Sequence, residues 1–205
     1  MTAAIEIFER LASGLPLHVR DWDAQGAAAQ GPQAAVLVAL TDEPQPEVIL
    51  GHRAMHLLMH PGEVAFPGGK REPEDISPWV TALREALEEV GLSEELVSPL
   101  GELPPLITRT GFEVHPCVAR VPAGLELVVD PGEFSSIFQL PLATFADAGL
   151  FRLEEMWDGQ RMRKVPHYQV EGDNIWGVTA AVLAQLANVA YDAGLDLQRN
   201  WKLKP

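Results

Sequence analysis

Cysteine and basic side chains are both scarce in this chain of 205 residues. Cys117 is the single cysteine, which excludes an intramolecular disulfide and any cysteine-rich zinc or iron–sulfur site. Lys and Arg number 15 against 29 Asp and Glu, so the formal net charge is −14. Such an acidic chain is not expected to bind nucleic acid through its phosphates, nor an anionic membrane surface. It would also repel a phosphorylated metabolite, unless a bound cation or a local basic patch reversed the sign at the site.

Long apolar runs are absent as well. None of them approaches the ~20 residues that a membrane-spanning helix needs. Residues 1–17 lack the basic start and the apolar stretch of a secretory signal. We therefore expect a cytoplasmic protein with no membrane segment.

The remaining composition is that of a globular protein, with 47% apolar and 21% charged residues. Helical spacing of apolar residues predicts helices, and short β-prone runs between turn residues predict strands. The expected helices span residues 5–15, 78–90 and 175–193, and the expected strands span 34–40, 47–51, 96–101, 113–120, 150–156 and 165–170. Strands on both sides of a central helix, with a closing helix, indicate a mixed α/β sandwich in one domain.

The central helix carries three crowded glutamates. At about 100° per residue, Glu85, Glu88 and Glu89 fall within roughly 100° of one another. Four apolar residues gather on the opposite side, namely Val80, Leu83, Leu87 and Val90. The pattern predicts a helix that packs by its apolar face and presents carboxylates on the other.

Carboxylates three or four residues apart repel one another, and Arg84 offsets only part of that cost. A cation is therefore expected beside them, although a solvated acidic face is a common alternative. The glycines at 68 and 69 favour a site, because a residue without Cβ lets the backbone approach an ion or a phosphate. Oxygen ligands select hard cations such as Mg²⁺ or Mn²⁺, which would also reverse the local charge.

Residues 84–92 resemble the second half of the Nudix hydrolase signature, Arg-Glu-apolar-x-Glu-Glu-x-Gly-apolar, at every specified position. In the first half, Arg84 follows Gly69 by 15 positions, one more than the signature has, and Asp75 stands where its first Glu is expected. The resemblance implies a single-domain Nudix-type α/β/α sandwich with a mixed β-sheet. Residues 1–32 would then form an N-terminal helix and a flexible connection, and residues 33–205 the Nudix domain.

Upstream residues are similar to the coenzyme A pyrophosphatase branch of that family. Arg53, Gly62 and the Phe-Pro-Gly-Gly run at 66–69 stand at the spacing of its motif, while Leu58 occupies the position of the second motif arginine. In that branch, water cleaves the pyrophosphate of coenzyme A into 3′,5′-ADP and 4′-phosphopantetheine. The resemblance thus implies a small-molecule phosphoanhydride substrate and a Mg²⁺ or Mn²⁺ cofactor.

The resemblance also implies roles for the acids. Glu85 and Glu89 would be metal ligands, and Glu88 would be a further ligand or the group that orients or deprotonates water. The carbonyl oxygen of Gly69 would be an additional ligand, and Arg84 would hold the glutamates in place.

Further site candidates lie outside the helix. Glu133 stands where many relatives supply another acid from a distant loop, and an ordinary solvent-facing glutamate is the alternative. Arg53, Lys70 and Arg71 are the candidates for phosphate contact, and His60 for substrate contact.

A zinc stripe is the other pattern to consider, since His52, His56 and His60 recur at intervals of four. Pro61, directly after the last of them, argues against one continuous helix, so zinc is disfavoured.

Three functions stay open at this point. The first is a pyrophosphatase acting on coenzyme A or its thioesters. The second keeps the chemistry but takes another nucleoside diphosphate derivative, which Leu58 in place of arginine supports. The third is a non-catalytic nucleotide-binding module, which the complete set of glutamates disfavours. The oligomeric state is open, with a homodimer as one option.

Overall fold

The structure is a computed structural model that describes residues 2–16, 21–22, 31–157, 159 and 162–197. Most of the expected flexible connection, and the C-terminal residues from 198, lie outside the described residues. The main sheet contains the following strands: β1 (Gln33–Thr41), β2 (Glu47–Arg53), β3 (Val64–Ala65), β4 (Gly68–Lys70), β5 (Ser98–Glu102), β6 (Leu106–Ile107), β7 (Glu113–Val121) and β8 (Phe134–Pro141).

The main sheet is mixed. Its path runs β3-β2-β1-β7-β5, with β4 paired to β1, β6 to β7 and β8 to β2. Strands β1 and β7 are parallel, with Leu37 opposite Cys117, and the other pairs are antiparallel. These two strands are mostly buried, which explains their nearly continuous apolar sequences.

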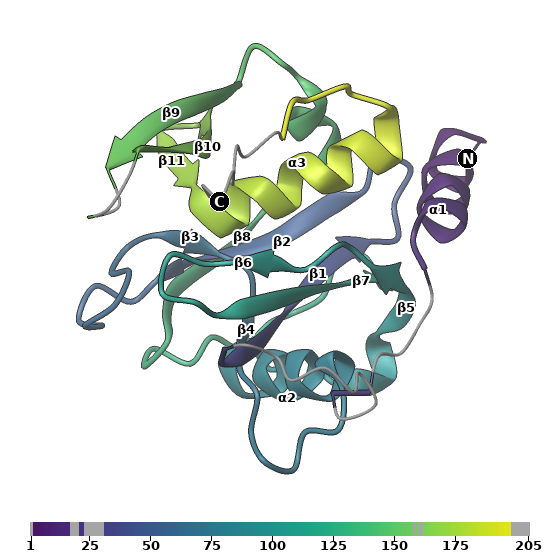
Figure 1. Cartoon of the computed structure of the whole chain (residues 1–205). Coiled ribbons are helices and arrows are strands. Elements are labelled where there is room, and N and C mark those ends of the chain that lie inside the picture. The colour runs from purple at the N-terminus through teal and green to yellow at the C-terminus, as the bar shows by residue number, and fades with distance from the viewer. Residues whose placement is uncertain (1, 17–20, 23–30, 158, 160–161, 198–205) are drawn as a thin grey trace.

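Helices cover both faces of this sheet (Figure 1). Helix α2 (Pro78–Val90) packs on one face, and α3 (Gly177–Tyr191) lies on the other, with α1 (Thr2–Gly14) beside α3. Two separate apolar cores result, one on each side of the sheet. The expected α/β/α sandwich is confirmed. No helix among the described residues combines the length and the apolar content that crossing a membrane requires.

A smaller antiparallel sheet follows the main one in the chain. It is ordered β11-β10-β9 and consists of β9 (Phe151–Trp157), β10 (Met162–Val170) and β11 (Asp173–Trp176). The short helix η2 (Leu142–Ala146) leads into it, and the hydroxyl of Tyr168 donates a hydrogen bond to the Phe145 carbonyl at 2.9 Å. This sheet therefore packs into the core on the α3 side.

Helix α2 has the expected bounds, and its ends explain them. Ser77 caps the first turn by accepting a hydrogen bond from the Val80 amide, and Pro78 suits the first helical position. Gly91 ends the helix in a left-handed conformation with φ 67°.

The expected faces of α2 are partly wrong. Val80 and Leu87 are 37% and 55% exposed, whereas Glu89 is only 4% exposed. The helix packs instead through Trp79 and a row that includes Ala82 and Ala86. Small alanine side chains let the helix lie close to the sheet, so Glu89 is drawn into the interface instead of facing solvent.

Candidate active site

Strand β4 brings a glycine amide onto the buried glutamate of α2. The Gly68 amide donates to Glu89 Oε2 at 2.8 Å. Gly68 has φ 152°, and a Cβ there would meet the Ala35 carbonyl oxygen and Val36 of β1. The local sequence thus needs glycine to pair β4 tightly with β1, and this pairing aims the amide at the Glu89 carboxylate.

Gly69 lies directly under a second glutamate. A Cβ at this position would collide with the Glu85 carboxylate. The Glu85 side chain is 16% exposed, so its carboxylate is partly shielded from water against the β4 backbone. Two carboxylates from successive turns of α2 therefore meet the Gly68-Gly69 backbone.

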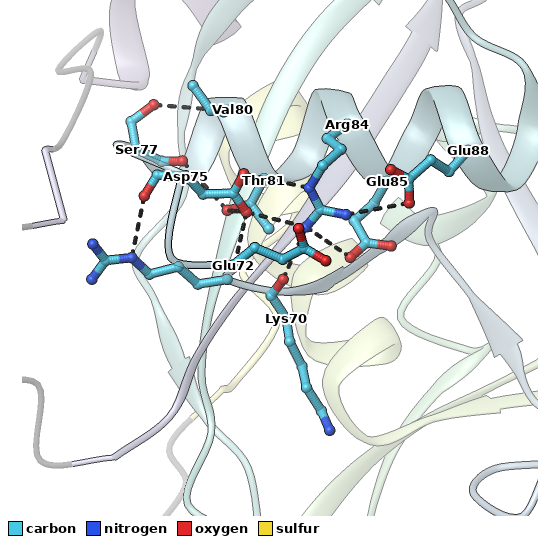
Figure 2. A network of polar contacts seen from close by, with 10 residues as sticks. Lys70, Glu72, Asp75, Ser77, Val80, Thr81, Arg84, Glu85 and Glu88 are labelled. Atoms are coloured by element: carbon cyan, nitrogen blue, oxygen red, sulfur yellow. Dashed lines mark hydrogen bonds and ion pairs between the residues drawn. The ribbon is translucent and has the colours of Figure 1, made fainter.

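Arg84 joins the neighbouring acids into one network (Figure 2). Its Nη2 lies 3.1 Å from the Lys70 carbonyl oxygen, 3.1 Å from Asp75 Oδ2 and 3.1 Å from Glu85 Oε1. Its Nη1 lies 3.3 Å from Glu88 Oε2. These contacts fit the role expected for Arg84, which is to hold glutamates in place.

Asp75 is a buried partner of that arginine. Its side chain is 3% exposed and accepts hydrogen bonds from the Glu72 amide and the Thr81 hydroxyl, both at 2.9 Å. Burial pushes the Asp75 pKa upward, but the hydrogen bond from Arg84, with those from Glu72 and Thr81, leaves the pKa below its usual value. Asp75, which stands where the signature has its first Glu, is therefore paired with Arg84. Thr81 was not predicted from the sequence as a second partner of Asp75. The signal that could have found it is a threonine six residues after Asp75, within an otherwise apolar stretch.

Burial and neighbouring negative charges raise the pKa of Glu85 and of Glu89, which we call the inner glutamates. Burial is the largest cause at Glu89, whose pKa rises to about 8 although the Gly68 hydrogen bond opposes the rise. Glu85 and Glu133 raise it further, and Arg53 lowers it. Burial also raises the pKa of Glu85, against the opposing effect of Arg84. A cation bound beside these carboxylates would offset their mutual repulsion.

Two expected residues from outside α2 reach the same place. Arg53, at the end of β2, has its Nη2 3.5 Å from Glu133 Oε2, and the Ala54 amide donates to the Glu133 carbonyl at 2.9 Å. Both side chains also act electrostatically on the pKa of Glu89, which Glu133 raises and Arg53 lowers. The structure thus pairs Arg53 with Glu133, and it places Glu85 and Glu89 against the Gly68-Gly69 backbone.

Other candidates lie apart from this group. Arg71 donates to the Asp75 carbonyl and to Gln33 Oε1, and its guanidinium sits 5.6 Å from the centre of the Trp22 ring. Figure 2 shows the Lys70 side chain extending away from Arg84 and the glutamates, and its Nζ lies 5.5 Å from the centre of the Phe112 ring.

The three spaced histidines do not form a stripe. His52 lies in β2, where its Nε2 is 2.9 Å from Asp173 Oδ2 of the smaller sheet and its Nδ1 is 3.0 Å from Ser136 Oγ. His60 is exposed in the following loop and pairs with Glu63 at 3.0 Å. His52 therefore links the two sheets, a role that its spacing did not indicate.

The donor set around Gly69 suits a hard divalent cation. Among the residues the structure describes, no three His, Cys, Asp or Glu side chains already converge as a metal site. Arg84 and the Gly68 amide hold the glutamates at present. Even so, the Glu85 carboxylate lies against the Gly69 backbone, where a Cβ would obstruct it, and such oxygen ligands fit Mg²⁺ or Mn²⁺.

An α/β/α sandwich in which carboxylates lie over a glycine-rich strand is the arrangement expected of hydrolases that cleave phosphoanhydrides with a divalent ion. The family model described as the NUDIX domain matches residues 31–167. The chain is 39% identical over 155 residues to "Uncharacterized Nudix hydrolase NudL" of Salmonella paratyphi B, which covers 76% of this chain and 81% of that protein. A protein of the same name from Salmonella newport matches equally well.

Solved structures agree on the fold. A Nudix hydrolase from Alicyclobacillus acidocaldarius superposes with a TM-score of 0.53 at 19% identity, over 81% of this chain and 96% of that one. A MutT/nudix family protein from Enterococcus faecalis gives 0.51 at 17% identity, over 81% and 64%. The chain belongs to the Nudix hydrolase family, and it is an enzyme that acts on pyrophosphate bonds. Enzymes of this family generally use divalent metals such as Mg²⁺ or Mn²⁺.

Proposed function

We propose that the enzyme hydrolyses the pyrophosphate of coenzyme A or of its thioesters. The observation that carries the proposal is the position of Arg53, from the motif similar to the coenzyme A branch: it pairs with Glu133 and acts electrostatically on Glu89 of α2. A basic side chain at an acidic site offers a contact to a phosphate whose charge a metal ion neutralises.

The inner glutamates and the Gly69 carbonyl would hold the ion, with Glu88 or Glu133 completing the set. When bound, the ion supplies neutralisation of the phosphate charge and lowers the pKa of a water molecule. Arg84 positions Glu85 and Glu88 through its contacts with their carboxylates. Arg53 would orient the pyrophosphate, and Glu88, whose side chain is 60% exposed and paired with Arg84, would orient the attacking water or accept its proton.

The proposed reaction balances without a further reactant. Water adds to one phosphorus atom, the bridging phosphorus–oxygen bond breaks, and the proton of water is released to a carboxylate and then to solvent. The products are 3′,5′-ADP and 4′-phosphopantetheine, or the acylated form of the latter.

A second substrate class follows from Leu58. This side chain is 98% exposed, so the unliganded protein presents an apolar group where the similar motif has arginine. Another nucleoside diphosphate derivative is therefore the alternative. The non-catalytic module is set aside, because the chain belongs to a family of hydrolases and retains every glutamate of the signature helix.

A substrate panel with product identification tests the proposal. Coenzyme A, a dinucleoside polyphosphate, a nucleotide sugar and a nucleoside triphosphate are compared by kcat/KM with Mg²⁺ or Mn²⁺. We expect coenzyme A compounds to be preferred by at least about tenfold. Equal turnover of coenzyme A and unrelated nucleotides would contradict the proposal. The Glu89→Gln variant serves as the control for a contaminating activity.

A further inference from the structure

His52 of β2 lies between a hydroxyl group and a carboxylate. Its Nδ1 is 3.0 Å from Ser136 Oγ, and its Nε2 is 2.9 Å from Asp173 Oδ2. Strand β8 supplies the serine directly opposite His52, and β11 of the smaller sheet supplies the aspartate. The three side chains thus form one chain of hydrogen bonds that runs from serine through imidazole to carboxylate.

The two partners of His52 fix the position of its ring proton. In a neutral imidazole one nitrogen donates and the other accepts, and an ionised carboxylate can only accept. Nε2 therefore donates to Asp173, and Nδ1 accepts from the Ser136 hydroxyl. Serine hydrolases activate their nucleophile through the same order of groups, in which the imidazole takes the hydroxyl proton and the carboxylate stabilises the imidazolium.

The surrounding strands hold the ring and the hydroxyl in place. The His52 ring stacks on Phe138 of β8, with the ring centroids 4.6 Å apart and the planes at 28°. The register of β2 and β8 shifts between His52 and Arg53, which leaves Ser135 as an extra residue on β8. The Ser135 hydroxyl donates to the His52 carbonyl oxygen at 3.2 Å, so the two adjacent serines have different partners.

A purely structural link between the two sheets does not require this arrangement. The hydrogen bond between His52 and Asp173 joins the main sheet to the smaller one, but Ser136 lies in a strand that already pairs with the strand of His52. The contact with Ser136 therefore adds no further link between the sheets. Ser136 is exposed, and the side chains of His52 and Asp173 are 30% and 36% exposed, so a small reagent can reach the hydroxyl.

We propose that Ser136 is the nucleophile of a second hydrolytic activity, the cleavage of small carboxylic esters, with His52 as its base and Asp173 as the residue that positions the imidazole. Ser136 Oγ attacks the carbonyl carbon of the ester, and its proton passes to His52 Nδ1. The bond between that carbon and the ester oxygen breaks, and the alcohol leaves with the proton. Water then adds to the acyl-serine, releases the carboxylic acid and restores the hydroxyl.

The test combines ester hydrolysis with covalent labelling, both in the presence of a chelator that suppresses metal-dependent turnover. 4-Nitrophenyl acetate is the substrate, and a fluorophosphonate is the label, located by peptide mass spectrometry. We expect the label on Ser136, and Ser136→Ala should lower kcat/KM for the ester by about 100-fold or more. Ser135→Ala is the matched control, since it removes the neighbouring exposed hydroxyl, and it should keep the parent rate.

Two further variants test the assigned roles. His52→Gln should lower the rate about as much as Ser136→Ala. Asp173→Asn should lower kcat by about tenfold or more with KM within about twofold, because the aspartate orients the imidazole without contacting the ester. A residue that served only to join the sheets would change the melting temperature and leave the ratio of kcat to KM of the folded protein unchanged.

Several results would overturn the inference. These are a parent protein that neither cleaves the ester nor takes the label, equal labelling of Ser135 and Ser136, or a Ser136→Ala variant with the parent rate. If His52→Gln fails to fold, the comparison of the two serine variants decides alone. Pyrophosphate hydrolysis with Mg²⁺ or Mn²⁺ should stay within about twofold of the parent in Ser136→Ala, so failure here leaves the proposed function intact.

Discussion

At the scale of single residues, Arg84 is the residue on which most polar contacts of the site depend. Its removal leaves the Asp75 carboxylate, 3% exposed, without its cation. Because an unpaired buried charge is costly, we expect Arg84→Met to lower the free energy of unfolding by about 3 kcal/mol. Urea denaturation at pH 7 measures this loss.

The matched control removes an exposed arginine from its pair. Arg152 and Glu154 form an ion pair at 2.6 Å with both side chains 42% exposed. Arg152→Met should cost less than about 1 kcal/mol, since exposed pairs contribute little. Equal losses for the two variants would show that the Asp75 pair is not the stabilising contact we describe.

The raised pKa of Glu89 predicts that the free energy of unfolding of the metal-free protein depends on pH. Its pKa is raised from the ordinary value of 4.5 to about 8, mainly by burial. The folded state therefore holds this proton more tightly than the unfolded chain. The stabilising contribution of the protonated group is complete below pH 4.5 and is lost as the pH rises to about 8.

Glu89→Gln removes that titration, so its melting temperature should fall less than that of the parent between pH 5 and pH 8. Thermal melts in the presence of a chelator measure the difference. Glu95→Gln, which changes an exposed acid, should follow the parent curve. Equal decreases in the melting temperature of Glu89→Gln and of the parent between pH 5 and pH 8 would show that Glu89 is not the group responsible.

At the scale of elements, two adjacent glycines of β4 are expected to have different roles, Gly68 in stability and Gly69 in catalysis. A Cβ on Gly68 would strike the backbone of β1, which cannot yield, so Gly68→Ala should destabilise the protein strongly. The nearest atoms to a Cβ on Gly69 would be those at the end of the Glu85 side chain, which can swing away. We expect the melting temperature of Gly69→Ala to stay within about 3 °C of that of the parent. Its kcat should fall by about tenfold or more, because a metal ligand is displaced.

The two alanine variants control each other, since both add one methyl group to the same short strand. Melting temperature and turnover are measured on each. Wild-type turnover in Gly69→Ala would show that Glu85 need not lie against this backbone, and an intact melting temperature in Gly68→Ala would contradict the tight pairing of β4 with β1.

The spacing of residues within one segment predicted the elements that depend on that segment alone. Helical spacing predicted α2, and its observed bounds match the expected 78–90; in the structure Ser77 caps its start and Gly91 ends it. Strand β8 was not expected, because at Ser135 and Ser136 its sequence lacks apolar alternation. It pairs with β2 alone in the main sheet, so partly exposed polar residues are tolerated there.

Periodicity could predict the candidate site only where one helix turn supplies its chemistry, whereas Arg53 and Glu133 were named from the family resemblance. Helical spacing brought the glutamates together, but it could not show that Glu89 is buried, because that depends on β4 and β1 arriving from elsewhere. The same limit explains Arg71, which follows the glycines in sequence yet lies against Trp22. Contacts between distant segments are set by tertiary packing, which periodicity does not encode.

At the scale of the whole molecule, an acidic protein has to bind an anionic substrate. The net charge is −14, and the inner glutamates add to the local repulsion. The sandwich holds these glutamates of α2 against β4, where Arg84 contacts Glu85, while Arg53 contacts Glu133. A divalent ion that neutralised this corner would stabilise the fold and attract the substrate through the same interaction.

Metal addition should therefore raise the melting temperature. A ligand at 100 times its Kd stabilises the folded state by about 2.7 kcal/mol, which for a chain of this size corresponds to about 5–10 °C. Differential scanning calorimetry with MgCl₂ or MnCl₂, against NaCl at equal ionic strength, measures the shift. The Glu85→Gln/Glu89→Gln variant should show less than about half of it, because the variant retains the fold but lacks two ligand carboxylates. A shift of equal size with NaCl, or in the double variant, would place the ion elsewhere and remove the basis for metal binding at Gly69.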